Sequence, residues 1–424
     1  MSVSNRSSGP SRLTRYVGGL VIVLLSGAFA SQGVAQSSAP PRVVAIGDIH
    51  GDFDAFRGIL ENAGILDAAG RWIAGRTTLV QTGDMIDRGT KVRAVMDLLM
   101  GLEEQATAAG GRVQVLLGNH EVLNLAGEGR DVTPAIYATF ADEQSEERRQ
   151  AAYDAYVKLC AARSLQLPRP TPRIYQPSSR DLWMAEHPPG FIEYRDAFGP
   201  QGRYGSWLRT KPAVLQLGDT VFQHAGIKPD VAPRKLEDIN KQVATEIKRI
   251  DEYRSRMTAR NLILPFFTLE EVLAAAQAEL AGGGNARRTA DGIEGLGSSD
   301  SSDPLGLEGL LRSGTWALFD ANGPMWFRGF ATWSAVEGAA QITKLLRRYN
   351  VAHFVVGHSV VSTMRITPRF SAAVFLIDTG MLSSVYQGGR ASALEIRDGR
   401  FTAIYADQRA ILFEAGREVA PLRR

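Results

Sequence analysis

The chain has 424 residues, 44% of them hydrophobic, which is enough apolar material for one large core or two modest ones. Its formal charge is +3, and removing the three arginines of residues 1–35, which hold no acidic residue, leaves zero. A nucleic-acid partner is therefore not expected. The single cysteine, Cys160, excludes an intrachain disulfide, and Gln166 stands where a thiol phosphatase would carry its phosphate-binding arginine.

Residues 1–35 are predicted to be a secretory signal peptide. Their arginines precede an apolar run from Tyr16 to Leu25, which is shorter than the roughly 20 residues needed to span a bilayer. Small residues give two alternative cleavage sites, after Ala30 or after Ala35. The mature chain is expected to be secreted or periplasmic, without a stable membrane anchor.

From residue 42 onward, strand-like apolar runs alternate with amphipathic stretches, which predicts βαβ units. The expected strands are 43–46, 78–81 and 113–117, and the expected helices between them are 53–60 and 92–102. Each strand is followed by a Gly-Asp or Gly-Asn step. Because ligands of open α/β sheets collect beyond the carboxyl ends of the strands, the chemistry is expected there.

Two segments interrupt this alternation. Residues 128–201 combine a charged helical stretch with a proline-rich piece, and we interpret them as an inserted cap or lid. His187 is a candidate to line this cap, although a packed histidine is the more frequent case. The second insertion, 228–315, is mostly helical and includes a Gly/Ser/Asp-rich run, 282–303, that is expected to be flexible.

Strand patterning also returns between and after the insertions. The expected strands are 213–217, 220–224, 351–356, 374–377, 393–396 and 401–405, with a helix over 335–349. The predicted fold class is therefore α/β: one domain over 42–424, a two-sheet β-sandwich flanked by helices, with two mostly helical insertions.

The first two strand-end motifs carry carboxylates. In Gly-Asp-Ile-His, Asp48 and His50 can aim an oxygen and a nitrogen at one ion, although an ordinary turn is an equal alternative. In Gly-Asp-Met-Ile-Asp-Arg-Gly, Asp84 can bridge two cations and Arg88 offers a planar fork for phosphate oxygens. The alternative for this second motif is a helix cap followed by a surface ion pair.

The third motif is Gly-Asn-His-Glu at 118–121. The amide oxygen of Asn119 is a metal ligand without charge, and His120 can protonate a leaving group if Asp87 holds its ring. Glu121 is expected to support the site rather than bind metal. The central ligands of the three motifs lie 36 and 35 residues apart, the size of one βαβ step. Together they predict a metal site that handles phosphate.

Two later histidines also follow strands beside glycine, His224 in His-Ala-Gly and His358 in Gly-His-Ser. A lone histidine is more often structural than a ligand. Four of the chain's six histidines share this strand-end setting, which favours ligation for His224 and His358. His353 lies inside an apolar run and is expected to be packed.

The motifs GDIHGD, GDMIDRG, GNHE, HAG and GHS, in this order, resemble the phosphoprotein phosphatase family of calcineurin-like metallophosphoesterases. The resemblance covers residues 42–380 and implies that family's fold. It implies one metal held by Asp48, His50 and Asp84. It implies a second metal held by four residues, Asp84, Asn119, His224 and His358. His120 would be the general acid, paired with Asp87, and Arg88 would bind phosphate.

A second phosphate-binding arginine is implied between the last two histidines, and Arg328 in Trp-Phe-Arg-Gly fits that place. This variant resembles the bacterial-type Shewanella-like and Rhizobiales-like branch, which is associated with phosphotyrosine. The HAG segment in place of HGG, and the two insertions, depart from the compact eukaryotic enzymes and leave substrate choice open.

The expected reaction is hydrolysis of a phosphomonoester, on a phosphoprotein or a small substrate, by a hydroxide that two metal ions share. Asp, His and Asn ligands suit manganese, iron or zinc alike. A dinucleoside polyphosphate hydrolase, acting for example on diadenosine tetraphosphate, resembles the same motifs and is the main alternative. A metal-dependent binding module without activity is the other, and the intact motif set disfavours it.

Overall fold

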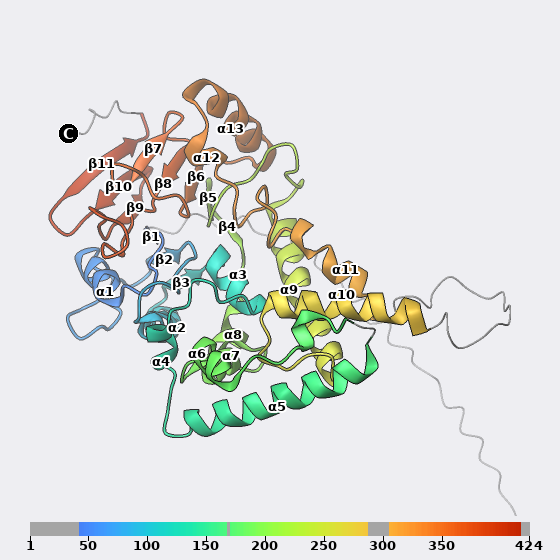
Figure 1. Cartoon of the computed structure of the whole chain (residues 1–424). Helices are drawn as coiled ribbons and strands as arrows, with labels where there is room; N and C mark the ends of the chain where they lie inside the picture. The colour runs from blue at the N-terminus through green and yellow to red at the C-terminus, as the bar shows by residue number, and fades with distance from the viewer. Residues whose placement is uncertain (1–41, 168–169, 287–304, 417–424) are drawn as a thin grey trace, which may run out of the picture. The chain divides into compact units, whose positions relative to one another are not determined.

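The six-stranded sheet places three of the predicted motifs at one edge (Figure 1). In this computed structural model its order is β11-β10-β9-β1-β2-β3, and β1, β2 and β3 run parallel. Its strands are β1 (Val43–Ile46), β2 (Thr78–Gln81), β3 (Arg112–Val115), β9 (Ala393–Arg397), β10 (Arg400–Ile404) and β11 (Arg409–Glu414). Parallel neighbours end at the same edge, so the loops after β1, β2 and β3 meet.

The structure describes residues 42–167, 170–286 and 305–416, all within the second of the chain's two units, Ser37–Arg424. The predicted signal peptide, residues 1–35, lies outside the described residues. So does most of the Gly/Ser/Asp-rich run, although its first residues continue helix α10 to Ala286. None of the described helices is long and apolar enough to cross a membrane.

The second sheet has five strands in the order β4-β5-β6-β8-β7. Strands β5, β6 and β8 are parallel, so the loops that follow β5 and β6 also share one edge. Its strands are β4 (Val214–Leu217), β5 (Thr220–Gln223), β6 (His353–Val356), β7 (Thr367–Arg369) and β8 (Val374–Leu376).

A layer of apolar side chains joins the two sheets. Strand β1 alternates: Val43 and Ala45 belong to this layer, whereas Val44 and Ile46 belong to the core shared with the helices. The rings of Phe375 (β8) and Phe401 (β10) stack at 4.4 Å, one from each sheet. His353 packs against Phe401 at 4.5 Å between ring centroids and is buried, as its apolar run predicted.

Helices cover the outer faces of both sheets. Helices α1 (Phe53–Asn62) and α2 (Val92–Ala108) share an apolar core with the first sheet, and α12 (Gly329–Thr332) and α13 (Ala335–Tyr349) share it with the second. Helix α3 (Asn119–Ala126) begins directly beyond β3 and is buried along its whole length. The predicted two-sheet sandwich flanked by helices is confirmed.

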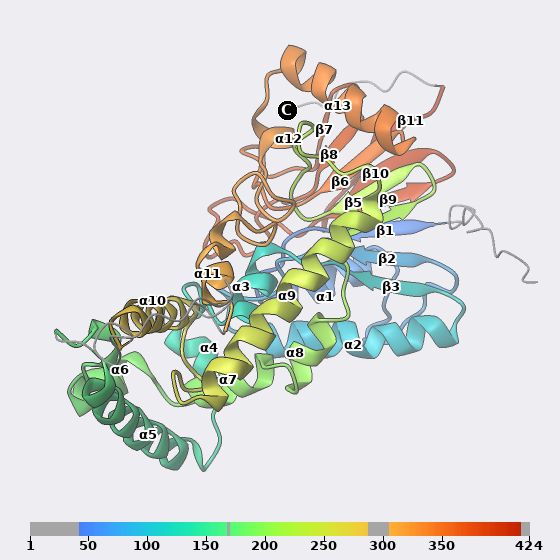
Figure 2. The same ribbon diagram turned by 90° about the vertical axis from the view of Figure 1, so that its right-hand side faces the viewer.

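Elements of the two predicted insertions pack on one another (Figures 1 and 2). Tyr156 and Trp183 from the first share a buried cluster with Met257 and Val272 from the second. Cys160 lies in the same cluster, fully buried, which raises the pKa of its thiol to about 11. The described α-helices of the two predicted insertions are α4 (Pro134–Ala138), α5 (Ser145–Gln166), α6 (Arg180–Glu186), α7 (Phe191–Phe198), α9 (Leu236–Ala259), α10 (Leu269–Ala286) and α11 (Leu307–Leu311). Helix α8 (Arg203–Leu208) lies between them in the sequence.

Candidate active site

The six predicted metal ligands meet where the two sheets present the carboxyl ends of their parallel strands. Each is nearly buried, with at most 6% of its surface exposed. They are Asp48 and His50 after β1, Asp84 after β2, Asn119 at the start of α3, His224 after β5 and His358 after β6.

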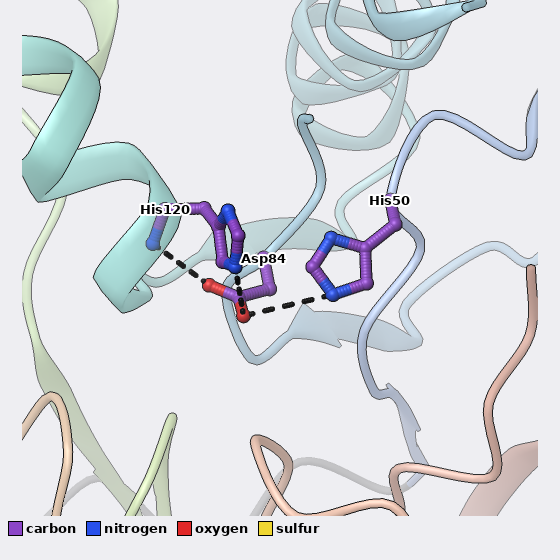
Figure 3. A group of neighbouring side chains, drawn as sticks. All are labelled: His50, Asp84 and His120. Atoms are coloured by element: carbon purple, nitrogen blue, oxygen red, sulfur yellow. Dashed lines mark hydrogen bonds and ion pairs between the residues drawn. The ribbon is translucent and has the colours of Figure 1, made fainter. Parts of the chain in front are cut away.

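Asp84 lies at the centre of the site (Figure 3). Its Oδ2 atom is 3.8 Å from Nε2 of His50, 3.8 Å from Nε2 of His120 and 3.4 Å from Nε2 of His224. Its other oxygen accepts the backbone N–H of His120 at 3.1 Å. Burial alone would raise the pKa of Asp84, but His224, His120 and His50 outweigh it and hold that pKa well below its usual value. The central group is therefore a carboxylate anion.

Several of these side chains are aimed by an unusual backbone. His50, Asp84, Arg88 and His358 have positive φ angles of 48°, 55°, 65° and 66°. Residues other than glycine seldom adopt this left-handed conformation, and such strain is concentrated at functional sites. Backbone hydrogen bonds hold the first two loops together, since the amides of Ile49 and His50 both donate to the carbonyl of Asp84.

His224 and His358 present unprotonated nitrogens to one another. Nδ1 of His224 lies 3.0 Å from the carbonyl of Thr82, and Nε2 of His358 lies 3.2 Å from the carbonyl of Trp326. Because a carbonyl only accepts, those two nitrogens carry the hydrogens. Nε2 of His224 and Nδ1 of His358, 3.0 Å apart, therefore face each other with lone pairs.

Two further acceptor atoms lie close to Nε2 of His224. Nε2 of His224 also lies 2.8 Å from Oδ1 of Asn119 and 3.4 Å from the carboxylate of Asp84. Burial, and then the neighbouring His224, lower the pKa of His358 to about 2, so protonation of that ring does not resolve the contact. Four converging acceptors that lack a shared hydrogen fit a bound cation. The donor set therefore suits the predicted second metal position.

The second group of potential ligands is His50, Asp84 and His120. Nδ1 of His50 lies 3.0 Å from the carbonyl of Ile86, which leaves its Nε2 free to bind. Burial lowers the pKa of His50 to about 3 and keeps the ring neutral. Arg88 places one guanidinium nitrogen 2.6 Å from Nε2 of His50 and the other 3.1 Å from Nε2 of His120. Because a guanidinium only donates, Nε2 of His50 is an acceptor in this arrangement, as a metal ligand must be.

Asp48 has a different set of contacts from His50. Its carboxylate accepts the backbone N–H of His358 at 3.0 Å and hydrogen-bonds the side chain of Asp378. Burial, and then the neighbouring Asp378 and Asp84, raise the pKa of Asp48. The ligand role of Asp48 stays a prediction, and its contact with Asp378 shows that it also links the loops after β1, β6 and β8.

Sequence reasoning missed Asp378. This residue follows β8 in the run Ile-Asp-Thr-Gly, so a strand-end acid before glycine was the available signal. It is 2% exposed, and burial raises its pKa to about 6. Asp48 and Asp378 together form a buried carboxyl pair beside the other proposed ligands.

Glu121 supports the site through the backbone, as expected from the sequence. One of its oxygens accepts the amides of Gly118 and Asp84, both at 2.8 Å, and the other accepts the amide of Met85 at 2.9 Å. Burial raises its pKa to about 7. Glu121 thereby ties the loop after β2 to the start of helix α3.

His120 and Asp87 are paired as predicted. Nδ1 of His120 lies 2.7 Å from Oδ2 of Asp87, and both side chains are buried. Although burial opposes protonation, Asp84 and Asp87 raise the pKa of His120 to about 9. This raised pKa favours the protonated ring that a general acid requires, and Nε2 lies 3.8 Å from the carboxylate of Asp84.

The two predicted phosphate-binding arginines lie on either side of these groups. Arg88 contacts the hydroxyl of Tyr386, a residue that sequence reasoning missed, and its guanidinium carbon is 5.7 Å from that ring. Arg328 donates to the carbonyl of His358 at 3.0 Å and to Ser359 at 3.1 Å. His187 is not part of the site, since it stacks on Trp183 at 4.0 Å within the first insertion.

Comparison with known proteins agrees with this geometry. Residues 41–223 match the family described as calcineurin-like phosphoesterase. Shewanella-like protein phosphatase 2 of Arabidopsis thaliana is 31% identical and covers 55% of this chain and 61% of its own. Shewanella-like protein phosphatase 1 of Plasmodium berghei is 22% identical and covers 86% of this chain and 74% of its own. A solved cold-active protein-tyrosine phosphatase of a psychrophilic Shewanella species has a TM-score of 0.53 at 22% identity, covering 88% of this chain and 81% of that chain.

Residues 41–223 therefore resemble a calcineurin-like phosphoesterase domain, and the names of the relatives support a phosphatase. The similarity to two Shewanella-like protein phosphatases agrees with the resemblance that the motifs indicated. The solved structure confirms the fold.

Proposed function

We propose that the protein is a two-metal phosphomonoesterase that acts on phosphoproteins, with phosphotyrosine preferred. The observation that carries this proposal is the meeting of acceptor atoms from His224, His358, Asn119 and Asp84 beside a protonated His120. A cation site beside a general acid, with two arginines at its border, matches the needs of phosphoryl transfer to water.

The proposed ligands are those that the motifs predicted. Asp48, His50 and Asp84 would hold one ion, and Asp84 would also belong to the second set with Asn119, His224 and His358. The ions, for which manganese, iron and zinc are candidates, would activate the attacking water and neutralise charge on the phosphoryl oxygens when bound. Asn119 in place of an acid limits negative charge, which suits a dianionic substrate.

The chain's own residues would do the rest. Arg88 and Arg328 would hold the phosphoryl oxygens through charge-assisted hydrogen bonds. His120 would give the proton on its Nε2 to the departing oxygen, while Asp87 stabilises the imidazolium through Nδ1. The attacking water displaces the leaving oxygen directly, so no covalent enzyme intermediate is needed.

The choice of phosphotyrosine rests on relatives. The solved structural neighbour is named a protein-tyrosine phosphatase, and the sequence relatives are named protein phosphatases. A phenoxide is also a better leaving group than an alkoxide.

The test is hydrolysis by protein reconstituted separately with manganese, iron and zinc. Matched phosphotyrosine and phosphoserine peptides and diadenosine tetraphosphate would be the substrates, and Asp84→Asn the inactive control. We expect the phosphotyrosine peptide to give the highest kcat/KM. Equal rates on the two peptides would remove the tyrosine preference, and faster turnover of the dinucleotide would replace the proposal with a polyphosphate hydrolase.

A further inference from the structure

A buried line of hydrogen bonds runs from the first insertion to the proposed general acid. The hydroxyl of Tyr194 in α7 donates to Oδ1 of Asn124 in α3 at 2.7 Å. Nδ2 of Asn124 donates to both carboxylate oxygens of Asp87 at 3.0 Å. Asp87 in turn contacts Nδ1 of His120 at 2.7 Å. All four side chains are at most 3% exposed.

The direction of these bonds is determined by chemistry. An ionised Asp87 can only accept, so the amide of Asn124 must turn its NH₂ group toward it. That NH₂ group also donates to the carbonyl of His120 at 2.9 Å, which is the second reason for this orientation. Oδ1 of Asn124 then faces Tyr194, and the Tyr194 hydroxyl must be the donor. Each bond therefore fixes the next.

Tyr194 is held in place by aromatic packing. Its ring stacks on Phe198 at 4.5 Å and meets Phe140 and Tyr137 edge-on at 4.8 and 5.2 Å. Both rings belong to the same insertion: Tyr137 lies near the end of α4, and Phe140 lies just beyond that helix. The hydroxyl of Tyr194 therefore points at Asn124 from a position that the insertion builds.

We propose that Asn124 and Tyr194 are positioning residues for His120, and that the first insertion thereby serves the general acid rather than only covering the site. Tyr194 orients the amide of Asn124, Asn124 orients the carboxylate of Asp87, and Asp87 holds the His120 ring with Nε2 toward the leaving oxygen. This inference rests on the proposed function, in which His120 protonates the leaving group.

Tyr194→Phe tests the proposal because it removes one oxygen and keeps the ring. Tyr137→Phe is the matched control, because it removes a hydroxyl from the same aromatic cluster while the hydrogen bond from Tyr194 to Asn124 stays in place. A purely structural role predicts that the two variants behave alike. A positioning role predicts that only Tyr194→Phe lowers kcat. The loss should be largest on substrates whose leaving oxygen must be protonated by the general acid.

Two substrates that differ in their leaving group distinguish the positioning role from the purely structural role. Phenyl phosphate needs a proton donor more than 4-nitrophenyl phosphate does, because its leaving oxygen is more basic. We expect Tyr194→Phe to lower kcat about tenfold on phenyl phosphate and about twofold or less on 4-nitrophenyl phosphate, with KM unchanged. Asn124→Ala should show a larger loss with the same pattern. In a His120→Asn background neither change should lower kcat further.

A second readout does not depend on activity. In zinc-reconstituted protein labelled with ¹⁵N-histidine, Tyr194→Phe should shift the Nδ1–H resonance of His120, whereas Tyr137→Phe should leave it in place. If wild-type protein hydrolyses no phosphomonoester, the proposed function fails while this resonance still decides the positioning role. Equal effects of the two tyrosine variants on the resonance and on leaving-group dependence would overturn the inference.

Discussion

Nε2 of His224 and Nδ1 of His358 lie 3.0 Å apart, and the carbonyl partners of the two rings show that neither nitrogen carries a hydrogen. When both rings are neutral, the two lone pairs face each other, and a cation between them would remove their repulsion. The histidines come from parallel neighbouring strands, 134 residues apart along the chain. Sheet pairing thus creates a contact that suits a metal-binding site.

Metal binding is therefore expected to stabilise the folded protein. Removal of metal by a chelator should abolish phosphatase activity and lower the Tm by several degrees, and manganese or zinc should restore both. His358→Ala should lower the bound metal by about one ion per chain, measured by elemental analysis. His187→Gln is the control, because His187 packs on Trp183. Unchanged metal content in His358→Ala would contradict this ligand set.

The pKa of His120, raised to about 9, predicts the pH dependence of the reaction. A general acid works in its protonated form, so the rate on phenyl phosphate should be sustained at neutral pH and fall as pH rises through about 9. His120→Asn should be about 100-fold slower and should lack this alkaline decrease. A decrease that persists unchanged in His120→Asn would assign it to another group.

Arg88 and Tyr386 are expected to act together on phosphate. Arg88→Ala should lower kcat/KM by about 100-fold, because a charge-assisted hydrogen bond to the transferring group is lost. Tyr386→Phe removes the hydroxyl that contacts Arg88 and should raise KM several-fold with a smaller change in kcat. Tyr405→Phe, a tyrosine outside this contact, serves as control. Inorganic phosphate inhibition should weaken in parallel with KM, and an unaltered inhibition constant would argue against the role.

The carboxyl pair of Asp48 and Asp378 predicts a pH dependence of stability in metal-free protein. Burial raises the pKa of Asp378 to about 6, so the folded chain holds a proton that the unfolded chain releases near pH 4. The stabilising contribution is present below pH 4 and is lost as pH rises through 6. Asp378→Asn should therefore be more stable than wild type at pH 7, by about 1–3 kcal/mol, and no more stable at pH 4. Denaturant unfolding at the two pH values measures this difference.

Much of the fold could be predicted because the first strands are short buried runs separated by clear helices. The predicted strands 43–46 and 78–81 coincide with β1 and β2. Strands β7 and β11 were missed, since β7 has only three residues, including Pro368, and β11 begins with an exposed arginine. These two strands form because they pair with neighbouring strands, and the local sequence pattern carries no information about that pairing.

The sequence by itself determined which residue types follow the strands, and therefore the edge where the predicted ligands Asp48, His50, Asp84 and Asn119 meet. Local spacing suffices for this, because consecutive parallel strands end at one edge. Only the tertiary structure decided that Asp378 pairs with Asp48 and that Tyr194 reaches Asn124. These contacts join residues 330 and 70 positions apart, and they arise from sheet packing and from the insertion's aromatic core, which no motif encodes.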